Sequence, residues 1–419
     1  MSAEVKPGYK MTDVGVIPED WDVSSVGREF EIKLGKMLDA EKNVGVPKPY
    51  IGNKAVQWDR IDLSDLSTVP MSRSDLERFR LRKGDLLVCE GGEVGRAALW
   101  NAPIEECYYQ KALHRLRPIR GFDSRLMVAL LRQWSDRGML TNYVTQTSIA
   151  HLPREKFVDV PIPVPPPPEQ RAIATALGDV DALLGALERL IAKKRDLKQA
   201  AMQQLLTGQT RLPGFHGEWE VKRLGEVATF LKGKGLSKSA LSPYGSDPCI
   251  HYGELFTRYP ETISEIISFT NGSRDSFRSL ANDVLMPTSD VTPRGLAKAS
   301  CVTVDGVILG GDILVIRSDI NLVFGPFLSY VIRREEDQVL QLVTGSTVFH
   351  LYGSDMKQFT FFMPSVQEQT AIAAVLADMD AEQAALEQQL AKTRAIKQGM
   401  MQELLTGKTR LVSPEVSNA

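Results

Sequence analysis

A long segment occurs twice in this sequence. PPPPEQRAIATALGDVD (165–181) and PSVQEQTAIAAVLADMD (364–380) share a proline start, Glu-Gln, Ala-Ile-Ala, a leucine and Asp-x-Asp. The two copies lie 199 positions apart and stay in register, without a gap, up to the closing LLTGQTRL and LLTGKTRL. A gapless repeat of this length indicates a duplicated structural unit.

The regions between the copies are related more faintly. WDVSSVGREF near the start resembles WEVKRLGEVA, and the same comparison places Asp85 against Asp283 and His151 against His350. The closing TGKTRL has nothing left to continue into, and its missing continuation resembles the start of the first domain, GVIPEDWDV. The sequence therefore reads as a circle cut once, and we expect its two ends to lie close together.

A chain of 419 residues is too long for one ordinary core, which predicts two or more domains. The repeat sets the boundaries. We expect a first variable domain at 1–164, a central helix at 165–208, a second variable domain at 209–363, a C-terminal helix at 364–412 and a disordered tail at 413–419.

Each repeated segment has apolar residues at alternating steps of three and four, the pattern of a coiled-coil seam. Prolines precede both segments, and Gly208 and Gly407 stand where a helix end favours a left-handed residue. A helix with such a stripe must bury it, and the nearest partner is the other copy. The residues expected to pair the helices are Ile173, Leu177, Leu184, Leu187, Ile191, Leu205, Ile372, Leu376, Leu386, Leu390 and Leu404.

Both repeated segments are acidic at the start and more basic toward the end. Antiparallel packing would place opposite charges side by side, although the helix dipole favours the same distribution on its own. The predicted fold class is α+β, with two mixed α/β domains separated and joined by two long antiparallel coiled-coil helices. A pseudo-twofold axis and a circular repeat would relate the halves.

The two variable domains mix strand and turn signals with a helix. GDLLVCEGGEVGRAALW (84–100) predicts strand, glycine-rich turn, strand; NDVLMPTSDVTPRGLAKAS (282–300) is its counterpart; and SRLMVALLRQWSDRGML (124–140) predicts a helix. Glycines in such turns let a backbone approach a ligand closely, but tight turns without a ligand need them too. Basic runs at 73–83 and 110–120, taken alone, are more typical of solvated faces.

Composition excludes several classes of protein. The net charge of −2 does not indicate a nucleic-acid binder by itself, although the local distribution of charge matters more. Four scattered cysteines form no C-x-x-C, the start lacks a signal peptide, and no apolar run is long enough to span a membrane, so we expect a reduced, cytoplasmic protein.

Catalytic motifs are also missing. TGKT (406–409) lacks the earlier glycine of a phosphate-binding loop and ends a helix instead of beginning one. No nucleophile elbow, no metal-ligand spacing and no amino-methyltransferase signature occurs, and the Asp-x-Asp carboxylates would not face each other on a helix. We therefore expect no catalytic residue and no metal site.

The two repeated segments, the two variable domains and the circular order together resemble the specificity subunit of type I restriction-modification enzymes. The resemblance covers essentially the whole chain. It implies that each variable domain is a target recognition domain reading one half of a split DNA sequence, that the helices set the spacer length, and that the seam residues also form the docking region for partners. It implies double-stranded DNA and two methyltransferase subunits as partners, with restriction or translocase subunits joining in some complexes, and no membrane.

No cofactor is then expected on this chain, because S-adenosylmethionine, ATP and Mg²⁺ would belong to the partner subunits. Side chains suited to base edges or phosphates are candidates for DNA contact. They are Lys36, Asn53, Lys54, Gln57, Arg60, Arg73, Gly92, Glu93, Arg96, Lys111, Ser148, His151, Lys234, Lys238, Ser289, Asp290, Thr292, Arg294, Thr347 and His350. A structural role remains open for both histidines. Glu-Gln of each repeat is expected at the domain–helix junction and the docking surface.

Two other functions stay open. A DNA-binding or scaffold protein of another defence or chromosome-organising system could use the same architecture, and association with a methyltransferase would discriminate the two. A nuclease or transferase with an unrecognised site is the enzyme alternative.

Overall fold

The structure, a computed structural model, describes residues 5–39, 41–146, 150–272 and 275–412. These residues form two compact units. The first contains residues up to 187 together with those from 389 onward, and the second contains residues 188–388. The expected tail at 413–419 lies outside the described residues, as does the candidate Ser148.

The first unit is built around an antiparallel sheet with the strand order β10-β9-β12-β4. A smaller sheet, β11-β5-β8, pairs β11 with β5 in parallel. The bounds of these strands are β4 (Phe30–Leu34), β5 (Val46–Ile51), β8 (Thr68–Met71), β9 (Leu86–Cys89), β10 (Ala97–Leu99), β11 (Tyr108–Tyr109) and β12 (Leu113–Pro118).

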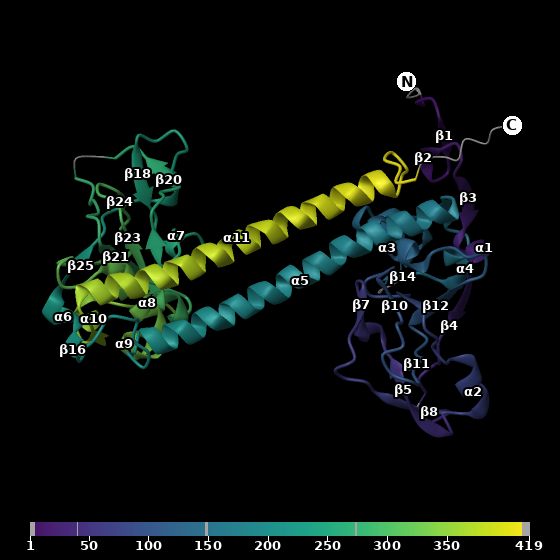
Figure 1. The fold of residues 1–419 in the computed structure, drawn as a ribbon, viewed down its shortest axis with the longest axis horizontal. Coiled ribbons are helices and arrows are strands. Elements are labelled where there is room, and N and C mark those ends of the chain that lie inside the picture. Colours follow the sequence, from purple (N-terminus) through teal and green to yellow (C-terminus); the bar gives the residue numbers. More distant parts are fainter. Residues whose placement is uncertain (1–4, 40, 147–149, 273–274, 413–419) are drawn as a thin grey trace. The chain divides into compact units, whose positions relative to one another are not determined.

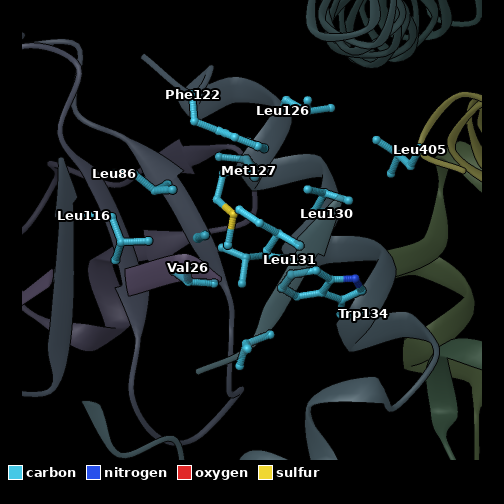
Figure 2. Close-up of a cluster of buried hydrophobic side chains, with 14 of the residues drawn as sticks. Val26, Leu86, Leu116, Phe122, Leu126, Met127, Leu130, Leu131, Trp134 and Leu405 are labelled. Atoms are coloured by element: carbon cyan, nitrogen blue, oxygen red, sulfur yellow. The ribbon is translucent and has the colours of Figure 1, made fainter. Parts of the chain in front are cut away.

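Helix α3 (Ser124–Asp136) covers one face of the larger sheet. It begins where Asp123 accepts a hydrogen bond from the backbone N–H of Arg125, an N-cap that satisfies one free donor of the first turn. Met127 of this helix points toward Val26, Leu86 and Leu116, whereas Leu126 and Leu130 lie on the side of Leu405 (Figure 2). Alternate residues of β9 serve opposite faces, so the other face belongs to a second core shared with the smaller sheet.

The remaining elements of the first unit are short. They are β1 (Tyr9–Thr12), β2 (Gly15–Pro18), β3 (Asp22–Ser25), α1 (Val26–Glu29), η1 (Asn53–Ala55), β6 (Val56–Gln57), β7 (Arg60–Ile61), α2 (Arg73–Arg78), η2 (Met139–Tyr143), β13 (Thr145–Gln146), β14 (Ala150–His151), α4 (Arg154–Phe157) and β15 (Pro161–Val164).

The second unit repeats this arrangement. Its larger sheet has the order β17-β25-β21-β23-β19 and its smaller sheet the order β20-β18-β24, again with one parallel pair in the smaller sheet. The strand bounds are β17 (Ala228–Lys232), β18 (Asp247–Ile250), β19 (Thr262–Ile263), β20 (Ser268–Thr270), β21 (Asp283–Pro287), β23 (Ser300–Val302), β24 (Ile308–Leu309) and β25 (Ile313–Ser318). The expected mixed α/β character of both domains is confirmed.

Helix α8 (Gly325–Arg334) takes the place of α3, and the cores again lie on both faces of the larger sheet. The other elements are β16 (Glu220–Arg223), α6 (Leu224–Val227), η3 (Lys238–Ala240), α7 (Glu254–Thr257), β22 (Ser289–Asp290), η4 (Pro293–Ala297), α9 (Glu336–Leu342), β26 (Phe349–His350), α10 (Gly353–Met356) and β27 (Thr360–Met363).

The two repeated segments are single helices of 39 residues, α5 (Pro167–Leu205) and α11 (Val366–Leu404), drawn in teal and yellow in Figure 1. Past their ends, Gly208 and Gly407 have φ values of +72° and +66°, the left-handed conformation expected from the sequence. Each unit contains the first part of one helix and the last part of the other.

Within each unit the two helix portions run antiparallel. In the second unit, Lys194 lies 2.6 Å from Glu382 and Arg195 lies 2.7 Å from Glu387, which joins the basic end of α5 to the acidic start of α11. In the first unit, Lys397 pairs with Asp181 in the same sense. These pairs confirm the direction that the charge distribution predicted.

All eleven seam residues face the protein interior to some degree. Ile173, Leu177, Leu187, Ile191, Leu205, Ile372, Leu376 and Leu404 are buried, whereas Leu184, Leu386 and Leu390 are half-buried. Near the first variable domain the seam merges with the domain core, since Ile173 and Leu404 belong to the same cluster as α3. Burying each such side chain contributes about 1.5–3 kcal/mol.

Candidate nucleic-acid interface

The Glu-Gln dipeptide at the start of each helix anchors the adjacent domain. Glu169 accepts hydrogen bonds from the Trp21 indole N–H at 2.9 Å and from Arg410 Nε at 2.6 Å. Glu368 does the same with Trp219 and Arg211. The end of α11 is thus tied to the start of the first domain, where the circular reading of the sequence placed it.

The glutamine caps the helix that covers the sheet. Gln170 Oε1 accepts from the backbone N–H of Asp123 at 2.9 Å, and its Nε2 donates to the Pro165 carbonyl. Gln369 repeats both bonds with Phe324 and Pro364. The expected junction role is confirmed.

The expected role of the same dipeptides in partner docking is wrong for their side chains. Glu169 and Glu368 are each 1% exposed, Gln170 is 4% exposed and Gln369 is fully buried. The two carboxylates are enclosed by tryptophan and arginine, and both the oxygen and the nitrogen of each glutamine amide are bonded within the chain. These side chains therefore offer no surface to another protein.

In the first unit, four of the candidate DNA-contacting residues line one open cavity of about 590 Å³. They are Asn53, Lys54, Gly92 and His151. The floor is the glycine-rich turn after β9, where Gly91 pairs with the backbone of His151. A Cβ added at Gly91 would lie 2.9 Å from the His151 ring, so only glycine lets these segments meet this closely.

Asn53 is a polar group of this cavity whose orientation is fixed by a hydrogen bond. Its Nδ2 donates to the Gly91 carbonyl at 3.1 Å, which fixes the amide orientation and leaves Oδ1 as an acceptor. That oxygen is buried and has no protein partner. An amide held in a known orientation can exchange hydrogen bonds with a base edge. Glu90 lies alongside, and burial raises its pKa while His151 and Lys111 act in the opposite direction.

Three candidates of the first domain have partners inside the protein. Lys36 forms an ion pair with Asp75 at 2.8 Å, and Arg96 forms one with Glu93 at 3.0 Å. Arg96 also donates to the Asn53 carbonyl at 3.1 Å. Their positive and negative groups are therefore committed to holding the domain together.

The other candidates of this domain are spread along its surface. Arg60, Arg73 and Lys111 are exposed, and Gln57 donates to the Lys54 carbonyl at 2.7 Å. Lys111 and Lys36 border a second and larger hollow of about 1130 Å³.

That hollow also holds basic residues that the candidate set missed. They are Lys33, Lys42, Arg78, Arg117 and Arg154, against three acidic side chains, Glu31, Asp39 and Asp75. Arg78 and Arg117 fall within the basic runs visible in the sequence. The lining is net positive in a chain whose net charge is −2. Such local concentration of positive charge attracts phosphate.

In the second unit, Ser289 and His350 line a cavity of about 390 Å³ together with Lys232 and Tyr352. Ser289 and His350 are register partners of strands β22 and β26, and the His350 ring stacks on Tyr352 with centroids 6.0 Å apart. This pairing follows β21 in the second unit as the Gly91–His151 pairing follows β9 in the first.

The remaining candidates of the second domain are not part of that cavity lining. Asp290 accepts from the Thr292 hydroxyl at 2.7 Å, which makes a local turn, and Arg294 reaches Glu336 at 3.2 Å. Lys234, Lys238 and Thr347 are exposed.

A family model described as "Type I restriction modification DNA specificity domain" matches this chain twice, at residues 18–195 and 216–393. The chain belongs to this family. The resemblance noted from the sequence is confirmed, and each match covers one recognition domain and most of the helix that follows it.

Two specificity subunits from Methanocaldococcus jannaschii are similar to this chain over nearly their whole length. The protein named putative type I restriction enzyme MjaX specificity subunit is 22% identical, over 96% of this chain and 97% of its own. The MjaVIII specificity subunit is also 22% identical, over 94% of both chains.

Solved structures share the fold. The type I restriction-modification S subunit from M. genitalium has a TM-score of 0.60 at 16% identity, covering 95% of this chain and 98% of its own. A chain from a structure of type I restriction-modification complex assembly and conformational transition has a TM-score of 0.55 at 17% identity, covering 94% and 99%.

A second ion pair occurs in both domains of this chain. Asp85 and Asp283, aligned by the faint repeat, are each 1% exposed and each receive a two-pronged arginine, Arg117 and Arg317, at 2.5–2.8 Å. The arginines hold the ends of equivalent strands together. Neither arginine was predicted from the sequence to have this structural role.

The described part of the chain holds no group of three or more His, Cys, Asp or Glu side chains placed to bind a metal ion. All four cysteines are buried, and burial raises the pKa of Cys89 to about 11. Among the described helices, none is long and apolar enough to cross a membrane.

Proposed function

We propose that this chain is the DNA sequence-specificity subunit of a type I restriction-modification complex, in which each recognition domain reads one half of a bipartite DNA target. The observation that carries the proposal is the repeated pairing of a strand end with a histidine segment at a cavity, Gly91–His151 in one domain and Ser289–His350 in the other. Two equivalent readers with different side chains suit two different half-sites.

The chemistry of the first domain supports DNA contact. An oriented amide at Asn53 and an exposed Lys54 stand at one cavity, and the net-positive hollow with Lys111 is on the same domain. Phosphate contacts hold a protein in register on DNA, whereas amides read base edges.

The partners in this proposal are two methyltransferase subunits that supply S-adenosylmethionine, with ATP and Mg²⁺ belonging to restriction or translocase subunits, in the cytoplasm. The chain itself then catalyses nothing. Leu197 and Ile396 support two equivalent docking surfaces: they occupy the same position of the repeat and remain 46% and 49% exposed. Exposed apolar residues at matched positions are expected where two copies of one partner bind.

The long helices set the spacer between half-sites in this proposal. Each adds about 1.5 Å per residue, so an insertion of about four residues adds about one helical turn, 5.4 Å. A duplex rises about 34–36 Å in 10–10.5 base pairs. One extra turn therefore corresponds to one or two base pairs of spacer.

Sequencing of methylated adenines in cells that carry this chain and a cognate methyltransferase tests the proposal. We expect one bipartite motif, a changed half-site when residues 22–150 are exchanged for another such domain, and a longer spacer when about four residues are inserted near Ala192. Both half-sites changing together would contradict modular reading, and an unchanged spacer with altered half-sites would contradict the ruler.

Co-purification separates this function from the alternative. A scaffold of another defence or chromosome-organising system would not retain a methyltransferase subunit through purification.

A further inference from the structure

Four charged side chains connect the helices to the first recognition domain. Lys397 on α11 pairs with Asp181 on α5, and its ammonium also lies 3.8 Å from Asp59 in the turn between β6 and β7. Arg132 on α3 donates to the same Asp59 carboxylate at 2.8 Å. The Lys397 side chain is only 12% exposed, whereas the side chains of Asp181, Asp59 and Arg132 are 34–36% exposed, so Lys397 is the member of the cluster that is shielded from water and salt.

The second unit contains the same cluster. Lys198 pairs with Asp380 across the helices and lies 3.1 Å from Glu261, which Arg333 on α8 approaches to 3.6 Å. Tyr330 donates to the other oxygen of Asp380 at 2.6 Å. A lysine, a helix aspartate, a domain carboxylate and a domain arginine therefore recur at both domain–helix contacts.

In the first unit the cluster continues toward the candidate DNA cavity. The Arg132 guanidinium lies 5.5 Å from the centre of the Trp58 ring. The indole N–H of Trp58 donates to Glu93 at 2.6 Å, and Glu93 pairs with Arg96 at 3.0 Å. Arg96 then donates to the Asn53 carbonyl. These contacts form a continuous series from Lys397 on α11 to the backbone carbonyl of Asn53.

One residue of this chain of contacts is held in an unusual backbone conformation. Asp59 has φ +62°, which aspartate tolerates better than most residues but still adopts seldom. Its N–H is bound to the Ala97 carbonyl at 3.1 Å, and its carboxylate receives Arg132. Backbone held this way persists where surrounding contacts fix it, often beside a binding site.

We propose that Trp58, Glu93 and Arg96 are positioning residues that hold the Asn53 turn in its reading position and couple it to the Lys397–Asp181 pair. This inference rests on the proposed function, since it assigns Asn53 to the reading of the first half-site. Glu93 and Arg96 then act through Asn53 and do not touch DNA themselves. A displacement of the Lys397–Asp181 pair would then move Asn53 relative to the bases of the first half-site.

The experiment measures methylation by the full complex on the matched target and on targets with one substituted base pair in either half-site. The first variants are Glu93→Gln, which removes one hydrogen bond and keeps the side-chain shape, and Trp58→Phe, which removes the indole N–H together with part of the ring that faces Arg132. A lost bond to a charged group corresponds to about a tenfold change. We expect discrimination at the first half-site to fall by about tenfold and discrimination at the second to stay unchanged.

Two further variants separate positioning from general stability. Lys397→Met, several contacts away from Asn53, should also relax only the first half-site, and its effect should be non-additive with that of Asn53→Ala. Asp62→Asn, an exposed carboxyl of the same segment that only bonds Ser64, is the matched control and should leave both half-sites unchanged.

Several results would overturn the inference. They are an unchanged first half-site in Asn53→Ala, additive effects of Lys397→Met and Asn53→Ala, or equal loss of methylation on matched and substituted targets. If the unmodified complex itself methylates without a bipartite motif, the proposed function fails instead, and the two failures are thereby distinguished.

Discussion

One substitution can break the ion pairs that join the segment after α11 to Glu169 and Asp20 in the first unit. Arg410→Ala removes two hydrogen bonds to Glu169 and two to Asp20, and it leaves the Trp21 indole as the remaining donor to Glu169. Glu169 is 1% exposed, so its charge would stay buried with one hydrogen bond. Arg211→Ala makes the equivalent change at Glu368 in the second unit.

Breaking a buried ion pair by removing one partner costs about 3–5 kcal/mol. The Arg410 side chain is 20% exposed, and water can enter after truncation, which lowers the cost. We therefore expect Arg410→Ala to reduce the free energy of opening of the first unit by about 2–3 kcal/mol. That corresponds to an increase in amide exchange of about thirty- to more than a hundredfold.

Hydrogen exchange followed by mass spectrometry reads each unit separately, which matters because a chain of two units need not unfold in one step. Arg410→Ala should speed exchange in peptides of α3 and β12 and spare those of α8 and β25. Arg211→Ala should do the reverse. If either single variant speeds exchange in both units, or in neither, the conclusion that each arginine stabilises only its own unit is refuted.

Two other properties are testable on the same material. Burial lowers the pKa of His114 to about 4, and its Nε2 is bound to the Leu152 carbonyl. Because the unfolded state binds the proton more readily, the free energy of unfolding should fall as the pH drops from about 6.5 toward 4, by about 2 kcal/mol between pH 7 and pH 5 in urea denaturation. The variant His114→Gln should remove most of this pH dependence. Gly178→Ala in α5, where an added Cβ meets nothing within 4 Å, should stabilise the first unit by about 0.5–1 kcal/mol in thermal unfolding. Gly407→Ala is its control and should destabilise, since φ is +66° and the Cβ would lie 2.5 Å from Pro18; equal effects of both variants would contradict the argument.

The repeat was enough to predict the features that depend on local sequence and on symmetry. Heptad spacing identified the buried side of α5 and α11, and Gly208 marked a helix end. The alignment of Asp85 with Asp283 matched two equivalent positions, but it did not predict their ion pairs, because the arginine partners lie on strands 32 and 34 positions further along. A contact that occurs in both domains leaves the same residue types at matching positions of the repeat, so comparison of the two copies can find it.

The candidate site was harder to predict because residue type does not reveal what a side chain meets. Lys36 looked available to phosphate, but the fold brings Asp75 from 39 positions away to within 2.8 Å. Glu93 and Arg96 neutralise each other three residues apart. By contrast, Asn53 and His151 are far apart in sequence and do meet at one cavity. Only tertiary structure separates these cases.

The Asp-x-Asp motif of each helix has a structural role in joining the two helices. Its second aspartate, Asp181 or Asp380, pairs with the repeated lysine of the other helix, Lys397 or Lys198. That lysine also meets a carboxylate that differs between the domains, Asp59 in one and Glu261 in the other. The helix side is therefore constant and the domain side variable. A domain exchanged into this chain keeps this contact when it brings its own carboxylate to the same lysine, as an exchange of residues 22–150 does by including the position of Asp59.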